Sequence, residues 1–230
     1  MKTIGLIGGM SWESSIEYYR IINETAKEKL GGLHSAKSLM VTVDFAEIEK
    51  LQHADRWDEA EQILVKCAQD LERGGADFIV LCTNTMHKLA DQITANVNIP
   101  FLHIADATAE KIVKAGIKRI GLLGTRFTME HDFYKGRLVN NFGLDVITPE
   151  KEDRDIVHRV IYEELVLGKI VKSSRREYIR IMNELLANGA EGVILGCTEI
   201  ELLIKEGDCT APLFPTTKIH AIAAVEKALE

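Results

Sequence analysis

The chain has 230 residues, of which 46% are hydrophobic, and a formal net charge of −7. This composition supplies apolar side chains for substantial cores and excludes a disordered chain, while the acidic balance without a basic run excludes a nucleic-acid or anionic-membrane surface. No apolar stretch reaches the roughly 18 residues of a membrane span, and the chain runs from Met1 directly into a strand pattern, so we expect a cytoplasmic protein.

Short runs rich in Ile, Val and Leu alternate along the chain with longer amphipathic segments, a pattern typical of βα units on a parallel sheet. The expected strands are 3–7, 38–43, 78–82, 101–102, 119–123, 144–147, 192–195 and 213–214. The expected helices are 13–29, 57–74, 88–95, 105–115, 131–140, 151–167 and 173–188. The predicted fold class is therefore α/β, with mostly parallel sheets flanked by helices.

The two halves of the chain contain an internal repeat. Residues 75–83 (GADFIVLCT) align without a gap on residues 189–197 (GAEGVILGC), and residues 4–8 (IGLIG) resemble residues 120–124 (IGLLG). The two pairs occur in the same order and at similar spacing, which indicates duplication. We expect two similar lobes related by a pseudo-twofold axis. The first comprises 1–103 with the last segment 213–230, and the second comprises 104–212.

The repeat also predicts where a ligand binds. Thr83 and Cys197 occupy equivalent places in the two lobes, each just past the end of a strand. Ligands of open parallel sheets bind beyond the carboxyl ends of the strands, so we expect these two side chains to face each other across an active-site cleft between the lobes. Cys82 precedes Thr83 on the strand and is expected to point to the opposite face of the sheet.

No cofactor or metal site is expected from the sequence. The four cysteines lie far apart, without a CxxC pair or a histidine at ligand spacing, which favours neither a zinc site nor a disulfide framework. The glycines of residues 4–9 have neither the GxGxxG spacing of a dinucleotide site nor the lysine of a P-loop.

Three motifs resemble the aspartate/glutamate racemase family: GGMSWESS at 8–15, LCTNTMH at 81–87 and GCTE at 196–199. Segments 123–128, 164–169 and 216–220 also match in the right order, so the resemblance covers essentially the whole chain. The glycine-rich start and the Cys-Thr-Glu motif are similar to the aspartate racemase branch. The resemblance implies a mechanism without pyridoxal phosphate, in which a cysteine from each lobe flanks Cα of an acidic amino acid, either aspartate or glutamate.

This sequence departs from the family pattern at one of the two bases. The family commonly has Cys-Asn-Thr in the first motif, whereas Thr83 precedes Asn84 here. A threonine hydroxyl can donate or relay a proton, but its alkoxide is inaccessible near neutral pH. We therefore expect Cys197 and Thr83 to be the catalytic pair. The second-lobe cysteine of the family usually handles the L enantiomer, so L-aspartate or L-glutamate should be the better substrate. Cys82 stays open as the alternative to Thr83.

The family resemblance and the loop positions together predict the residues that bind the substrate. Those expected to contact its carboxylate and amino groups are Met10, Ser11, Gln52, Asn84, Thr85, Thr125, Thr128, Lys169 and Thr198. Gln52 and Lys169 are the positions offered for the distal carboxylate. Glu199 is interpreted as a structural or proton-balancing residue, since an anion beside Cys197 raises the pKa of the thiol.

Other functions remain compatible with the same residues. Other enzymes of the family use cysteines at the same positions to act on other small anions, so a different isomerase of the superfamily is one alternative. A protein that binds a dicarboxylate or amino acid without turning it over is another, and the missing first cysteine favours it. The resemblance also implies a homodimer.

Overall fold

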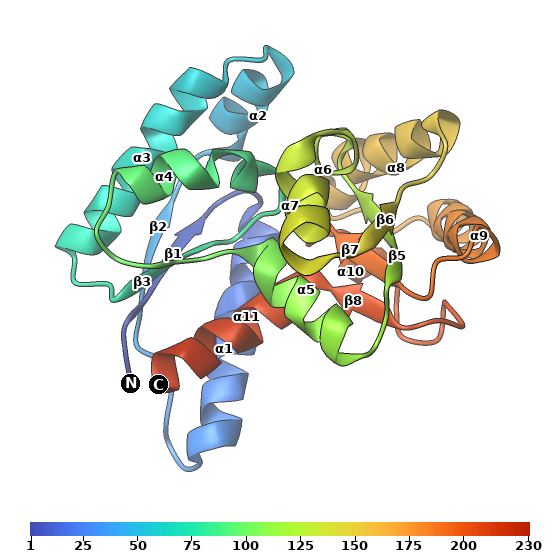
Figure 1. Cartoon of the computed structure of the whole chain (residues 1–230). Helices are drawn as coiled ribbons and strands as arrows, with labels where there is room; N and C mark the ends of the chain where they lie inside the picture. Colours follow the sequence, from blue (N-terminus) through green and yellow to red (C-terminus); the bar gives the residue numbers. More distant parts are fainter. The chain divides into compact units, whose positions relative to one another are not determined.

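The computed structural model describes all 230 residues and contains two compact units. Met1–His103 and His220–Glu230 form the first unit, and Ile104–Ile219 form the second. Each unit has one four-stranded parallel sheet flanked by helices (Figure 1). The predicted fold class, α/β with two similar lobes, is confirmed, and all eight expected strands are present with ends that differ by no more than one residue.

The first unit is built on β1 (Ile4–Gly8), β2 (Ser38–Thr42), β3 (Phe78–Leu81) and β4 (Phe101–Leu102). Its helical elements are α1 (Trp12–Leu30), α2 (Phe45–His53), α3 (Trp57–Arg73), the 3-10 turn η1 (Thr85–Leu89), α4 (Ala90–Ala95) and most of α11 (Thr216–Leu229). The strands are ordered β2-β1-β3-β4, and β1 pairs in parallel with both β2 and β3.

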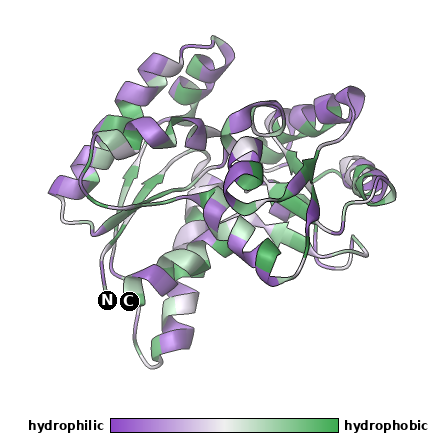
Figure 2. Ribbon diagram, in the orientation of Figure 1, coloured by the Kyte–Doolittle hydropathy of each residue, from purple (hydrophilic) through white to green (hydrophobic).

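Alternate side chains of β3 enter different cores because successive strand residues point to opposite faces. Ile79 and Leu81 pack with α2 and α3, whereas Phe78 and Val80 pack with α1 and α11. Cys82 continues the second series and is fully buried. The sheet of the first unit is therefore covered on both faces, which agrees with its strands being apolar in Figure 2.

The second unit repeats this arrangement. Its strands are β5 (Arg119–Gly124), β6 (Asp145–Ile147), β7 (Val193–Gly196) and β8 (Leu213–Pro215), in the order β6-β5-β7-β8. Its helical elements are α5 (Ile104–Lys114), α6 (Arg126–Glu130), α7 (Asp132–Phe142), α8 (Lys151–Glu163), η2 (Leu165–Leu167), α9 (Lys172–Ala187) and α10 (Ile200–Leu203). A core of α8 and α9 side chains covers one face of β5 and β7. The two units thus share one strand order, as duplication predicts.

The division of the chain differs from the expected one in its last segment. We expected 213–230 to belong to the first lobe, but residues up to Ile219 group with the second unit. The reason is that β8 pairs in parallel with β7, with Ile194 opposite Phe214. Only the part of α11 from His220 onward groups with the first unit, where Ala221 and Val225 enter the core beside α1.

Four helices, α2, α6, α10 and α11, were not predicted. Three of them have nine residues or fewer, too short for a clear apolar period, although Asp44 caps α2 by accepting from the Ala46 N–H. Helix α11 is longer but carries small apolar residues on several sides instead of one stripe. The structure contains no helix with the length and apolar character needed to cross a membrane.

Candidate active site

In the first unit, the predicted site residues gather where β1 and β3 end. These strands are neighbours, with Ile7 opposite Leu81, so the turn after β1 and the loop after β3 leave the same edge of the sheet. Ser11 lies in the first of these segments, and Thr83, Asn84 and Thr85 lie in the second, all of them buried. The structure thus brings these four predicted residues to one sheet edge.

The turn after β1 is held by its own serine side chains. Ser15 Oγ accepts from the Gly9 N–H at 2.8 Å and donates to the Ser11 carbonyl oxygen at 2.9 Å. Ser11 caps α1, and its Oγ accepts from the Ser14 N–H at 3.3 Å. Gly9 has φ of 93°, and a Cβ there would lie 2.2 Å from the Val43 carbonyl oxygen, so only glycine fits. The Met10 side chain packs into the core, which leaves its main chain as the part that can face a substrate.

Thr83 lies two residues after the end of β3 and is fixed through its main chain. Its N–H donates to the Leu81 carbonyl oxygen at 2.9 Å, and its own carbonyl oxygen accepts from His87 Nδ1 at 2.6 Å. Its hydroxyl makes no hydrogen bond in the structure. The Cys82 thiol lies in the core beside α1, where burial raises the pKa of this thiol far above its ordinary value. Cys82 therefore lies in the core, and its raised pKa opposes the thiolate form that a base requires.

The loop after β3 continues into η1 and meets α2. Asn84 precedes η1, and its carbonyl oxygen accepts from the His87 N–H at 3.1 Å. Gln52 on α2 is buried, and its side-chain amide donates to Met86 Sδ at 2.9 Å. This contact joins the α2 position predicted for the distal carboxylate to the helical turn that follows Thr83.

In the second unit, the equivalent edge is formed by β5 and β7, with Gly124 opposite Gly196. Thr125 caps α6 by accepting from the Thr128 N–H at 3.3 Å, and the two hydroxyl oxygens lie 3.2 Å apart. A Cβ at Gly196 would lie 2.7 Å from the Leu123 carbonyl oxygen. The two strands therefore approach so closely that glycine is required at the residue before Cys197.

Cys197 ends this segment next to a carboxylate. Its Sγ lies 3.0 Å from Glu199 Oε2, and the Thr198 hydroxyl donates to the same oxygen at 2.6 Å. Burial raises the pKa of the Cys197 thiol well above its ordinary value, and the Glu199 charge raises this pKa further. A thiol that donates to a carboxylate forms a pair sharing one proton and one negative charge.

Glu199 is the residue whose part in the site the sequence interpretation understated. Its interpretation as a structural or proton-balancing residue rested on the repulsion between two anions. The observed bond shows that the thiol donates to the carboxylate, so the pair need not carry two charges. The available signal was the spacing, because a residue two positions after a strand-end cysteine lies within reach of its sulfur.

Lys169 does not lie among the buried residues at the edge of either sheet. It follows η2 and Gly168, whose φ of 70° ends that turn, and its N–H donates to the Glu164 carbonyl oxygen at 3.0 Å. Its side chain is exposed on the surface of the second unit. Its contact with a distal carboxylate remains a prediction.

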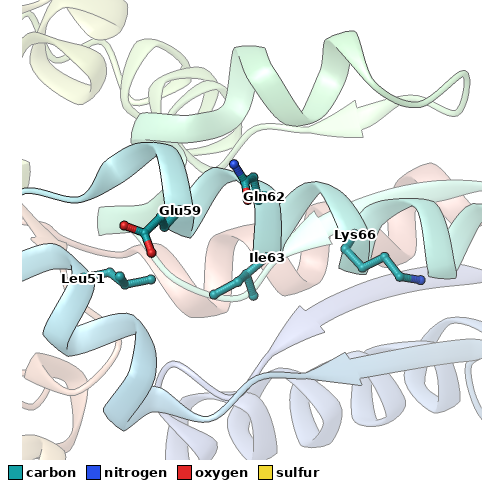
Figure 3. Close-up of a pocket in the computed structure, with 5 residues that line it drawn as sticks. All are labelled: Leu51, Glu59, Gln62, Ile63 and Lys66. Carbon is teal, nitrogen blue, oxygen red and sulfur yellow. The ribbon is translucent and has the colours of Figure 1, made fainter.

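A pocket of about 360 Å³ lies on α2 and α3 (Figure 3). Its lining residues are Leu51, Glu59, Gln62, Ile63 and Lys66. The two charged side chains already have partners, since Glu59 pairs with Arg56 and Lys66 pairs with Asp70. None of the predicted site residues lines this pocket, so it does not alter the assignment of the site. No three His, Cys, Asp or Glu side chains are placed to hold a metal ion.

The chain was compared with known families. Residues 7–224 match the model of the family described as Asp/Glu/hydantoin racemase, a span that includes all the predicted site residues. The chain belongs to this family. The match confirms the resemblance seen in the sequence, and membership in the racemase family supports an amino-acid racemase activity.

Relatives of this racemase-family chain include solved structures and curated proteins. A Yersinia pestis protein provisionally named an Asp/Glu racemase is 56% identical, with a TM-score of 0.94 and full coverage of both chains. An aspartate racemase homologue from Pyrococcus horikoshii OT3 is 37% identical, with a TM-score of 0.86 and full coverage of both. The broad-specificity amino-acid racemase RacX of Bacillus subtilis is 23% identical over 183 residues, which is 75% of each chain.

Proposed function

We propose that the protein interconverts the enantiomers of aspartate, glutamate or both by proton transfer at Cα, without pyridoxal phosphate. The observation that carries the proposal is the bond of 3.0 Å between Cys197 Sγ and Glu199 Oε2 at the end of β7. It pairs a buried thiol with a group that can take its proton, which is what a thiolate base requires. The family match supports the reaction class.

The proposed reaction begins with transfer of the Cys197 proton to Glu199. The resulting thiolate is buried and poorly solvated, so it is a stronger base than a thiolate in water. It removes the Cα proton of the L substrate and becomes a thiol again. The Thr83 hydroxyl delivers a proton to the opposite face and takes up another from water in the same step, because a free alkoxide is inaccessible near neutral pH. The hydroxide left by that water takes the proton that Glu199 received from Cys197, through solvent, which restores the starting protonation states.

This scheme requires Cα of the substrate to lie between Thr83 and Cys197, in a cleft that we propose between the lobes. Ser11, Asn84, Thr85, Thr125, Thr128 and Thr198 are proposed to bind the amino and α-carboxylate groups, with the Met10 main chain. Gln52 and Lys169 are proposed to bind the distal carboxylate. A homodimer in the cytoplasm is the assembly implied by the family resemblance.

The proposed pair is asymmetric, which predicts different initial rates for the two enantiomers. Removing a proton from the D substrate needs a base on the Thr83 side, and a threonine is a poor base. The equilibrium between enantiomers is unaffected, because L and D forms have equal free energy in water. Equal free energies also make kcat/KM equal for the two directions, so the expected difference lies in kcat. At saturating concentration, turnover should start faster from L-aspartate or L-glutamate than from the D form of the same amino acid.

Enantiomer-resolving chromatography of reactions started from each of the four substrates, each at saturating concentration, tests this proposal. We expect the opposite enantiomer to appear, faster from the L form, and to be absent with Cys197→Ser. The variant Thr83→Cys supplies the second thiol and should raise the rate from the D form more than the rate from the L form. Equal rates from both enantiomers with the unaltered chain would disprove the asymmetric assignment. Binding of all four without turnover would favour the amino-acid binding protein instead.

A further inference from the structure

His87 holds the main chain of Thr83 through a side-chain hydrogen bond. It lies on η1, four residues after Thr83, and only 2% of it is exposed. Its Nδ1 lies 2.6 Å from the Thr83 carbonyl oxygen. A carbonyl oxygen only accepts, so Nδ1 carries the hydrogen and the tautomer of the ring is fixed by this bond.

The His87 ring is packed among other buried rings. Its centroid lies 4.6 Å from that of His103, 5.5 Å from that of Phe101 and 5.8 Å from that of His220, each in an edge-to-face arrangement. Edge-to-face packing on several sides leaves the imidazole little room to rotate. The donor at Nδ1 is therefore held toward Thr83.

His220 is itself anchored by two hydrogen bonds. Its Nε2 lies 2.9 Å from the Leu102 carbonyl oxygen, so this nitrogen carries the hydrogen. Its Nδ1 lies 2.8 Å from the Tyr18 hydroxyl, which donates to it in the neutral ring. Side chains from α1, η1 and α11 and the main chain of β4 thus form one hydrogen-bonded and stacked support behind Thr83.

The second lobe has no equivalent support for its catalytic residue. The internal repeat places Glu201 at the position of His87, but the Glu201 carboxylate accepts from the Thr217 N–H at 2.9 Å. The Cys197 carbonyl oxygen accepts instead from the Ile200 N–H at 3.1 Å. A side-chain hydrogen bond to the carbonyl oxygen of the proposed catalytic residue is therefore specific to the lobe that carries threonine.

We propose that His87 is a positioning residue that orients Thr83 for proton delivery. With its N–H bonded to Leu81 and its carbonyl oxygen bonded to His87, Thr83 has a fixed main chain and an uncommitted hydroxyl. A proton donor must be held in place to act on a short-lived carbanion, and small misplacement of such a group lowers the rate steeply. The inference rests on the proposed function, in which Thr83 serves the second face.

The test compares His87→Asn with His87→Gln. The asparagine amide nitrogen can occupy the place of Nδ1 and keep the bond to Thr83, whereas the glutamine amide nitrogen reaches toward the place of Nε2 and loses it. L-aspartate and L-glutamate are incubated in D2O, and the initial rates of deuterated D product (inversion) and deuterated L product (retention) are measured. Retention needs only Cys197, which can remove a proton and return a deuteron on one face.

We expect His87→Gln to lower the ratio of inversion to retention by about tenfold or more. His87→Asn should stay within about threefold of the unaltered chain, as should the exposed control His34→Asn. An unchanged ratio in His87→Gln would overturn the inference, and so would an equal loss of inversion and retention, which indicates a structural role alone. If the unaltered chain exchanged no Cα proton, the proposed function itself would fail. Exchange with an unchanged ratio would refute only the role of His87.

Discussion

Alanine substitutions at the neighbouring residues Cys82 and Thr83 separate a core role from a catalytic one. Cys82 is fully buried among Leu6, Val80 and other side chains beside α1. Removing its sulfur costs the transfer free energy of one buried heavy atom and leaves a small void, about 1–2 kcal/mol in total. For a chain of this length, a change of 1 kcal/mol lowers Tm by roughly 2–4 °C, so we expect a decrease of about 2–8 °C for Cys82→Ala.

Thr83→Ala should behave in the opposite way. The Thr83 hydroxyl makes no hydrogen bond, so its removal leaves no buried partner unpaired and should change the free energy of unfolding by less than about 1 kcal/mol. Loss of the proposed proton donor should lower the rate of inversion by about 10²- to 10⁴-fold. Exchange of the L substrate with retention should continue, since Cys197 is intact.

The assay combines thermal unfolding with chiral analysis of L-aspartate and L-glutamate incubated in D2O. Cys82→Ala should lose stability and keep the unaltered ratio of inversion to retention. Thr83→Ala should keep stability and lose inversion. A Cys82→Ala protein that folds but no longer inverts the substrate, together with an active Thr83→Ala protein, would refute the reasoning and make Cys82 the second proton-transfer residue.

Two further predictions concern the segment that ends at Cys197. The Glu199 charge raises the pKa of Cys197, so Glu199→Gln should move the pH midpoint of Cys197 alkylation, followed by mass spectrometry, to lower pH; an unmoved midpoint would contradict this electrostatic coupling. Gly196→Ala places a Cβ against a rigid main-chain oxygen and should cost about 1–3 kcal/mol in urea unfolding. Gly136→Ala in α7, where the nearest atom is 3.4 Å away, should stabilise by up to about 1 kcal/mol, and similar effects of both substitutions would show that the close approach is unimportant.

The strands and the internal repeat were predictable from the sequence because buried parallel strands have a clear composition. The segments around Thr83 and Cys197 align without a gap, and the structure gives the strands before them the same place in two sheets of one order. The alternation along the strand also predicted that Cys82 points to the opposite face from Thr83, and the structure places Cys82 in a different core from Ile79 and Leu81. The alternation of side chains along a strand and the order of strands along the chain can both be read from a single sequence.

The membership of β8 could not be predicted in the same way. Its three residues include Pro215, and nothing in so short a strand indicates which sheet it joins. The pairing with β7 is a contact between residues about 20 positions apart, and it moves 213–219 into the second unit. Helix α11 was missed because it lacks a single apolar stripe.

The positioning contacts in the site were also beyond sequence reasoning. The tautomer of His87 follows from a measured contact with the Thr83 carbonyl oxygen, and no residue pattern shows where a ring nitrogen points. The hydrogen bond from Cys197 to Glu199 was not predicted, because the sequence argument considered only the repulsion between two anions. Lys169 was predicted from the family pattern, but its side chain is exposed. A match to the family pattern therefore does not show that a side chain lies among the buried site residues.

Loss of the Cα–H signal of L-aspartate and L-glutamate in D2O, followed by proton NMR, tests most directly whether Cys197 carries out proton transfer at Cα. We predict that the unaltered chain exchanges this proton in at least one of the two amino acids. The variant Cys197→Ala, shown to be folded by its thermal unfolding, should exchange none. Exchange by Cys197→Ala at the rate of the unaltered chain would contradict the assignment of the base, and binding without exchange by the unaltered chain would contradict the proposed reaction.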